Sequence, residues 1–191
     1  MDKKNKKIAV IFPGIGYHAD KPLLYYSSRV ARQYGYEVMC ADYGELPSSV
    51  KGDAKKMYEA YELALKHVTD QLSEVDFSAY AQVLFISKSI GTAVAASYDG
   101  MNKIGAGHVY YTPVEASFQA IGTAGIVFHG TGDDWARTSV IREECEKRGL
   151  PLYITEKANH SMETGDVLRD LEIIKEIMEE TEQYIRKFSE R

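Results

Sequence analysis

The sequence predicts an α/β protein, a three-layer sandwich in which a mostly parallel sheet is covered by helices on both faces. Short runs of β-branched and aromatic residues alternate with longer amphipathic stretches along the chain, the pattern of repeated β–α–β units. Several short runs are almost entirely apolar, as in strands that are buried on both faces. Because 191 residues suffice for one such core and no linker or repeat interrupts them, we expect residues 1–191 to form a single domain.

The chain begins with lysines, and we expect residues 1–7 to form a flexible basic tail. Six apolar or β-branched runs follow, each bounded by turn residues. The predicted strands are Ile8–Phe12, Tyr36–Cys40, Gln82–Ser87, His108–Thr112, Gly125–His129 and Leu152–Thr155.

The stretches between these strands show apolar residues at helical spacing. Gly35 ends the first helix, Asp53 caps the second, and Gly149 with Pro151 ends the fourth. The predicted helices are Lys21–Tyr34, the residues after Asp53, those after Ser89, Trp135–Lys147 and those after Asp166. The core-facing residues of the last helix are predicted to be Val167, Leu171, Ile174, Met178, Ile185 and Phe188.

Composition excludes several classes of function. The net charge is −5 and the lysines form no basic stripe, so we expect no nucleic-acid partner. The apolar run Ile8–Phe12 is too short for a signal peptide or a membrane span, so we expect no membrane association. Cys40 and Cys145 lie in no metal or redox spacing. We interpret them as reduced thiols of a cytoplasmic protein, and we expect no metal or cofactor.

The most informative segment runs from a buried strand directly into small residues that open a helix, Val83-Leu84-Phe85-Ile86-Ser87-Lys88-Ser89-Ile90-Gly91. So sharp a turn strains its apex residue and requires small residues two positions away on each side, here Ser87 and Gly91 around Ser89. The Ser89 hydroxyl would then project above the sheet edge at a helix N-terminus, as a nucleophile requires. Taken alone, the segment also fits an ordinary strand–helix junction with a capping serine.

This segment resembles the nucleophile turn of the α/β-hydrolase superfamily, whose pattern is Gly-x-Ser-x-Gly. Ser87 replaces the first glycine. The superfamily's chain order is serine, acid, histidine, and two later segments follow it. Ile126–Val127–Phe128–His129 leads into a Gly-rich turn that ends at Asp133, and the last strand leads into Ala158-Asn159-His160-Ser161-Met162-Glu163.

The resemblance implies a serine hydrolase with Ser89 as nucleophile, His160 as base and Asp133 as the acid that orients it. Asp134 is the alternative acid, although it is better placed to cap the following helix. The other histidines, His18, His67, His108 and His129, are interpreted as structural.

Two backbone N–H groups are expected to stabilise the oxyanion. One is that of Ile90. The other is that of Ile15, because Pro13-Gly14-Ile15-Gly16 resembles the superfamily's oxyanion loop.

The resemblance also implies six parallel strands in the order 2-1-3-4-5-6, with the active loops at their carboxyl ends. The segment from Pro113 to Ala124, where lids of the superfamily are inserted, is too short for a substantial cap. We therefore predict a small, lidless hydrolase that acts on a small-molecule acyl substrate with a short acyl group; a homodimer is left open. The predicted pocket walls are Tyr17, His18, Phe118, Trp135 and Met162.

Two alternatives are a flavodoxin-like binding protein, since this strand order also occurs there, and a hydrolase-fold protein without catalysis. The first loop lacks the hydroxyl residues expected around a phosphate. The presence of all three triad residue types argues against the second.

Overall fold

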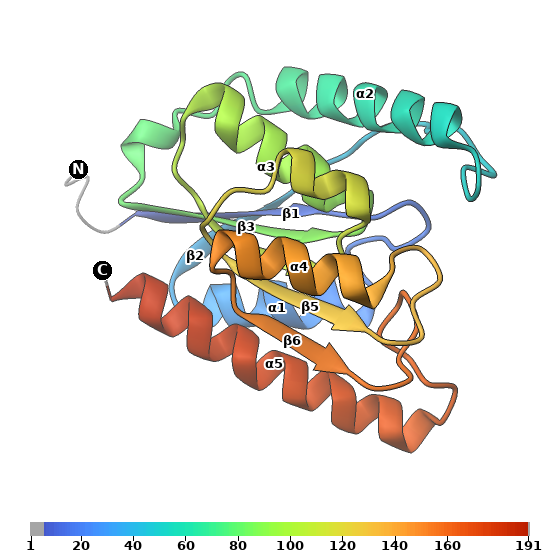
Figure 1. Ribbon diagram of the computed structural model, residues 1–191. Coiled ribbons are helices and arrows are strands. Elements are labelled where there is room, and N and C mark those ends of the chain that lie inside the picture. The colour runs from blue at the N-terminus through green and yellow to red at the C-terminus, as the bar shows by residue number, and fades with distance from the viewer. Residues whose placement is uncertain (1–5, 191) are drawn as a thin grey trace.

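The structure, a computed structural model, describes residues 6–190, in which strands and helices alternate as Figure 1 shows. Every strand lies within one residue of its predicted bounds at each end. The strands are β1 (Lys7–Phe12), β2 (Tyr36–Cys40), β3 (Gln82–Lys88), β4 (Gly107–Tyr111), β5 (Ile126–Gly130) and β6 (Leu152–Thr155). The helices are α1 (Pro22–Gln33), α2 (Ala54–Gln71), α3 (Ile90–Asn102), α4 (Thr138–Arg148) and α5 (Val167–Ser189), with short 3₁₀ turns at Phe77–Ala79 and Glu115–Gln119.

All strand pairs are parallel and the order is β2-β1-β3-β4-β5-β6, which confirms the predicted topology. The chain leaves β1 toward β2 on one side and continues in β3 on the other. The loops that follow β1 and β3 therefore diverge at the carboxyl edge of the sheet. In open parallel sheets, this switch point is where ligands bind.

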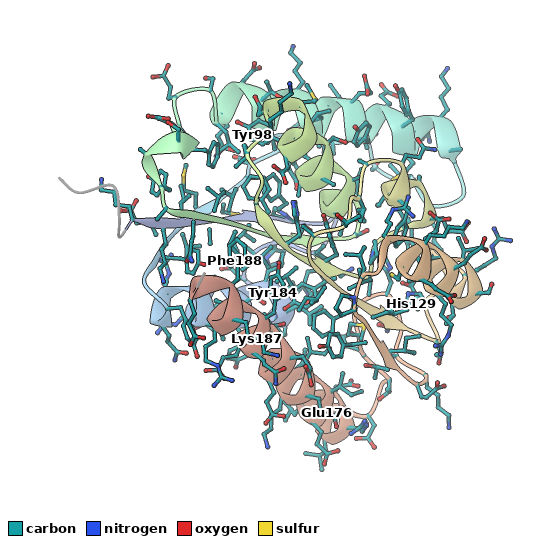
Figure 2. The ribbon with its side chains drawn as sticks, turned by 60° about the vertical axis from the view of Figure 1, so that its left-hand side comes forward. Tyr98, His129, Glu176, Tyr184, Lys187 and Phe188 are labelled. Carbon is teal, nitrogen blue, oxygen red and sulfur yellow. The ribbon has the colours of Figure 1, made fainter. Side chains whose placement is uncertain are left out.

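Helices cover both faces of the sheet (Figure 1). Helices α1 and α5 pack on one face in a core that includes Leu23, Ile86 and Ile177. Helices α2 and α3 cover the other face in a second core, and α4 packs beside α3 over β4 and β5. Figure 2 shows Tyr98 in the upper layer, on α3, and Tyr184 and Phe188 on α5 below the sheet. The predicted three layers are confirmed.

The predicted cap of α2 is present and α5 has a similar one, and each satisfies backbone N–H groups that a helix start leaves unpaired. Asp53 accepts hydrogen bonds from the N–H groups of Lys55 and Lys56 at the start of α2. Asp166 does the same for Leu168 and Arg169 at the start of α5.

Three details of the prediction were wrong. On α5 the prediction fails at Val167 and Leu171, which are 72% and 63% exposed, because the core contacts of this helix begin only at Ile173. Its buried residues are Ile173, Ile177, Thr181 and Ile185, and the predicted Ile174 and Met178 pack against the same core. Helix α4 begins at Thr138 rather than Trp135. Lys7 belongs to β1; of the predicted basic tail, residues 1–5 lie outside the described residues.

The α-helices between residues 6 and 190 include none that is long and apolar enough to cross a membrane.

Candidate active site

Ser89 occupies the strained turn between β3 and α3. Its backbone has φ 55° and ψ −124°, a conformation that costs a non-glycine residue free energy and is found mainly at functional sites. The Ser89 N–H donates to the carbonyl of Tyr111 at 3.0 Å, and its carbonyl accepts from Thr92 N–H at 2.9 Å. These two bonds fix the turn so that the serine side chain stands at the carboxyl edge of the sheet.

The small residues on either side of Ser89 are needed for different reasons. A Cβ at Gly91 would collide with the carbonyl oxygens of Phe12 and Pro13, so only glycine lets α3 approach the first loop. Ser87 is fully buried, and its hydroxyl donates to the Val109 carbonyl at 3.2 Å. The neighbouring strand thus accommodates a serine where the resemblance led us to expect glycine.

The turn after β5 and the loop after β6 pack tightly on each other. Gly132 N–H donates to the Ala158 carbonyl at 2.9 Å, and a Cβ at Gly130 would collide with that same carbonyl. Asn159 closes the second loop, since its side-chain oxygen accepts from the N–H groups of Ser161 at 2.8 Å and Glu163 at 3.1 Å. Two glycines and one asparagine therefore bring Asp133 and His160 together.

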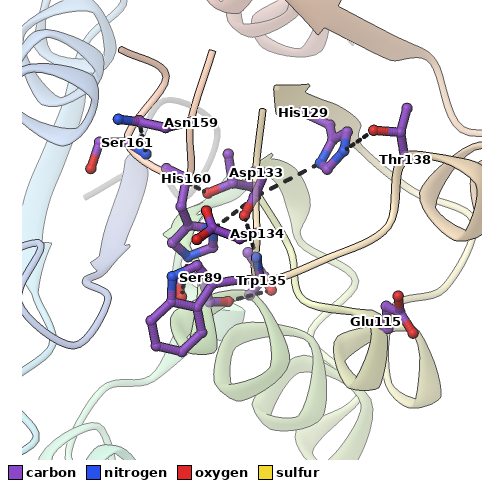
Figure 3. Close-up of polar contacts among 12 residues, drawn as sticks. Ser89, Glu115, His129, Asp133, Asp134, Trp135, Thr138, Asn159, His160 and Ser161 are labelled. Atoms are coloured by element: carbon purple, nitrogen blue, oxygen red, sulfur yellow. Dashed lines mark hydrogen bonds and ion pairs between the residues drawn. The ribbon is translucent and has the colours of Figure 1, made fainter. Parts of the chain in front are cut away.

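Ser89, His160 and Asp133 form one hydrogen-bonded chain (Figure 3). His160 Nε2 lies 2.8 Å from Ser89 Oγ, and His160 Nδ1 lies 2.7 Å from Asp133 Oδ2. An ionised carboxylate can only accept, so Nδ1 carries the proton and Nε2 is left to accept from the serine hydroxyl. Asp133 Oδ1 accepts from Trp135 N–H at 2.8 Å, which fixes the carboxylate.

Burial determines the protonation of the hydrogen-bonded triad. The Asp133 side chain has no exposed surface, and that of His160 is 17% exposed. Burial lowers the pKa of His160 below its ordinary value of 6.5; the hydrogen bond to Asp133 opposes this shift, and the charge of Lys88 adds to it. His160 is therefore neutral near pH 7, the state in which an imidazole can accept a proton.

The first loop lies directly against the nucleophile. Gly14 and Tyr17 exchange backbone hydrogen bonds of 3.1 and 3.2 Å, which makes residues 14–17 a tight turn. The Cβ position of Gly14 is 3.1 Å from Ser89 Cβ. Within residues 6–190, the N–H groups of Ile15 and Ile90 donate to no protein acceptor, as the two proposed oxyanion donors require.

The predicted pocket walls divide into two groups. Trp135 stacks on the His160 ring with centroids 5.3 Å apart, and His18 is exposed beside the first loop. Tyr17, Phe118 and Met162 are 6%, 3% and 0% exposed and belong to the hydrophobic cores. Their assignment as walls was wrong, because a loop position at the sheet edge does not reveal which way a side chain points.

Asp134 is not the acid that holds His160. Its carboxylate is exposed and bonds Lys51 Nζ at 2.8 Å, a hydrogen bond that lowers the pKa of Asp134. It does not cap α4 either, since the N-cap residue is Arg137.

Sequence reasoning missed the segment before α2. Lys51 Nζ also lies 5.4 Å from the centroid of the Trp135 ring, and the neighbouring Val50 is buried in a cluster with Ile90. No local motif signals these contacts, since they join residues far apart in the chain.

Three cavities lie around the triad, one lined by Asp133 and the others by residues next to it. A polar one of about 370 Å³ is lined by Asp133, Trp135 and Arg137, and another of about 680 Å³ follows the first loop. The third, about 270 Å³, has a mainly apolar lining and starts at Ile90, next to the nucleophile. Helices α2 and α3 and the segment around the 3₁₀ turn Glu115–Gln119 line it, with residues that include Met57, Tyr61, Ala93, Ser97, Val114 and Ala116.

His129 lies behind the acid and plays a structural part. Its Nε2 lies 2.9 Å from the Thr138 hydroxyl, and its Nδ1 lies 3.9 Å from Asp133 Oδ2. Burial lowers the pKa of His129, although the Asp133 charge opposes the shift, so the ring is neutral near pH 7. Among residues 6–190, no cluster of three or more His, Cys, Asp or Glu side chains is arranged to hold a metal ion.

No protein-family model and no curated protein sequence matches the chain. Solved structures do match. Est1E from Butyrivibrio proteoclasticus, solved with ferulic acid, superposes with a TM-score of 0.70 at 10% identity over 100% of this chain and 92% of that one. The Pyrococcus furiosus esterase Pf2001 gives 0.67 at 16% identity over 98% and 85%. XC6422 from Xanthomonas campestris, described as an α/β serine hydrolase without a lid, gives 0.63 at 11% identity over 95% and 81%.

These superpositions cover nearly the whole chain, so the protein has the α/β-hydrolase fold. The fold expected from the Ser89, Asp133 and His160 segments is confirmed, and the flavodoxin-like alternative is set aside. At these identities the likeness defines the fold alone.

Proposed function

We propose that the protein is a serine hydrolase that cleaves a small carboxylic ester or a related acyl compound through an acyl-enzyme. One observation carries the proposal: the hydroxyl of a serine with φ 55° is hydrogen-bonded to a neutral histidine, which is itself held by a buried carboxylate. Each group has the partner that its role requires.

The chemistry follows from these contacts. As the Ser89 oxygen attacks the substrate carbonyl carbon, its proton passes to His160 Nε2, and Asp133 stabilises the imidazolium that forms. His160 then gives the proton to the leaving alcohol, so that the ester bond breaks and Ser89 is acylated. Water deprotonated by the same histidine attacks the acyl-enzyme and releases the acid, which restores the free serine.

The surroundings of Ser89 support binding of the two ends of such a substrate. The N–H groups of Ile15 and Ile90 are offered to the carbonyl oxygen, where one donor is worth about 3–4 kcal/mol in the transition state of comparable enzymes. The apolar cavity that starts at Ile90 would take the acyl chain. Among the structural neighbours, one was solved with ferulic acid and another is an esterase, which agrees with a carbonyl substrate that has an apolar part.

The proposal is tested by treating the protein with a fluorophosphonate and measuring its intact mass. We expect one adduct, mapped by peptide sequencing to Ser89, and no adduct in Ser89→Ala. That variant should keep its fold, because removing one partly exposed hydroxyl costs little packing. An adduct on Ser87 or Ser161 would overturn the assignment of the nucleophile, and absence of any adduct would favour a protein without catalysis.

A further inference from the structure

Lys88, the residue immediately before the proposed nucleophile, is buried in a place where lysine is rarely found. It is the last residue of β3 and is 1% exposed. The strand alternates its side chains between the two faces of the sheet, so Lys88 lies on the same face as Ile86, toward α1 and α5. Very little of its surface is therefore open to a substrate.

The Lys88 side chain runs beneath the loop after β1. Its Cγ lies 3.5 Å from the Cβ position of Gly14, and its Nζ lies 5.0 Å from the centroid of the Tyr17 ring. Gly14 and Tyr17 are the two residues whose mutual hydrogen bonds close the turn around Ile15. The amine thus rests against the base of the turn that presents the Ile15 N–H.

No anion neutralises this amine directly. Within residues 6–190, Lys88 Nζ makes no hydrogen bond or ion pair, and it lies over the face of the Tyr17 ring in a cation–π contact. Charged groups act on it through space from two other loops: Asp133 after β5 and Glu163 after β6. The charge of Lys88 in turn lowers the pKa of His160, which lies on the same loop as Glu163.

A buried amine without an ion pair costs folding free energy, and an apolar side chain of the same length would fill the space without that cost. A role of the Lys88 charge at the neighbouring active site would explain why lysine occupies this position. Burial lowers the pKa of Lys88 to about 7, with Asp133 and Glu163 opposing the shift, so its charge changes within the range where a neutral His160 can act.

We propose that Lys88 is a positioning residue of the hydrolase: its side chain holds the Gly14–Tyr17 turn against Ser89, and its ammonium supplies positive charge beneath the oxyanion donors. This rests on the proposed function. The ammonium favours the transition state, in which negative charge develops on the carbonyl oxygen above it. The amine neither attacks nor accepts a proton from the substrate.

The test compares Lys88→Met, which keeps the length without the charge, with Lys88→Arg, which keeps the charge at every pH used. The measurement is kcat/KM for a short ester from mildly acid to mildly alkaline pH. In the unaltered protein we expect a rise as His160 loses its proton and a fall above about pH 7 as Lys88 becomes neutral.

Lys88→Met should lower the maximum about ten- to a hundredfold, less than the loss of a direct oxyanion donor. It should also move the acid limb to higher pH, because a charge that lowers the pKa of His160 is gone, and the alkaline fall should vanish. Lys88→Arg should regain most of the maximum, also without the alkaline fall. If Lys88→Met keeps the maximum and both limbs, or if both variants lose activity equally with unmoved limbs, the residue only fills space and the proposal is wrong.

A measurement that needs no turnover separates this proposal from the proposed function. The His160 imidazole is titrated by NMR in the unaltered protein and in Lys88→Met, and we expect a higher pKa in the variant. An unmoved pKa overturns the role of the Lys88 charge even if Ser89 reacts with a fluorophosphonate. If Lys88→Met fails to fold, Tyr17→Leu serves instead: without the ring under the ammonium, the alkaline fall should move to lower pH.

Discussion

Two histidine–aspartate pairs lie at opposite ends of the sheet, and their hydrogen bonds have nearly the same length. At the carboxyl edge, His160 Nδ1 lies 2.7 Å from Asp133 Oδ2. Near the amino end of β4, His108 Nε2 lies 2.8 Å from Asp99 Oδ2. The second nitrogen distinguishes them. His160 Nε2 meets the Ser89 hydroxyl at 2.8 Å, whereas His108 Nδ1 has no partner in the part of the chain that the structure describes.

The carboxylates also differ in their other partners. Asp99 accepts from the N–H groups of Gly105 and Ala106 after the end of α3, and the His108 ring stacks on Tyr110 with centroids 4.9 Å apart. That pair therefore joins α3 to β4. A histidine–aspartate hydrogen bond by itself does not indicate catalysis; its place relative to the strand ends and to a strained serine does.

The largest expected effect comes from replacing each histidine by glutamine. His160→Gln should lower kcat about 10⁶-fold, the order seen when a triad histidine is removed, because no other group can accept the serine proton. His108→Gln should keep kcat/KM per folded molecule and lower the melting temperature. Equal losses of turnover in the two variants, with both folded by circular dichroism, would show that the pairs do not differ as we describe.

The next effect sharpens the role of the acid. Asp133→Asn should lower kcat about 10⁴-fold, as in a comparable triad, because an amide no longer holds the histidine in the correct tautomer. The matched control is Asp134→Asn, which removes the exposed partner of Lys51 and should change kcat little. If the control carries the loss, Asp134 orients His160 in solution.

Each member of the triad could be predicted from the sequence because its position is encoded locally. Ser89 directly follows β3, Asp133 lies in the turn after β5 and His160 lies in the loop after β6, and parallel strands bring their carboxyl ends to one edge. The strand order, by contrast, is implied by the resemblance to the α/β-hydrolase superfamily.

Contacts between distant segments could not be predicted in this way. Nothing near Trp135 in sequence indicates that it stacks on His160 or that Lys51 covers it. Loop residues such as Phe118 and Met162 turned into the core, since the direction of a loop side chain depends on the whole packing arrangement. The sequence identifies Lys88 only as the residue before the nucleophile, because its burial depends on the Gly14–Tyr17 turn above it.

A smaller effect concerns stability at the second pair. Burial raises the pKa of Asp99, but hydrogen bonds from His108, Gly105 and Ala106 outweigh it, so the net pKa is below the ordinary 3.8. A lowered pKa stabilises the folded state at pH above 3.8, and this contribution disappears as pH falls through the folded-state pKa.

Asp99→Asn should therefore reduce the free energy of unfolding in urea by about 1–3 kcal/mol at neutral pH. The difference from the unaltered protein should shrink in acid, while kcat/KM stays unchanged at neutral pH. A difference that is constant with pH would mean that the Asp99 charge contributes nothing.

The smallest effect concerns the cavities beside the two pairs. The apolar cavity at Ile90 is about 270 Å³ and adjoins the nucleophile, while one of about 170 Å³ adjoins His108 and Asp99. Because the segment from Pro113 to Ala124 forms only the short 3₁₀ turn Glu115–Gln119, a substrate gains little binding energy from a chain that extends beyond the first cavity. We therefore expect kcat/KM to hold from acetyl to about hexanoyl p-nitrophenyl esters, to fall for longer chains, and to show no jump when micelles form.

Ala93 lines the first cavity, so Ala93→Phe should lower kcat/KM for hexanoate about tenfold relative to acetate, the order expected when a small apolar pocket is blocked. Thr123→Phe fills the cavity at His108 instead and should leave that ratio unchanged, because no reacting carbonyl lies near it. Equal loss for acetate and hexanoate in Ala93→Phe would place the acyl chain elsewhere, and the first candidate would then be the cavity along the Pro13–Tyr17 loop, whose lining includes Ile15 and His18.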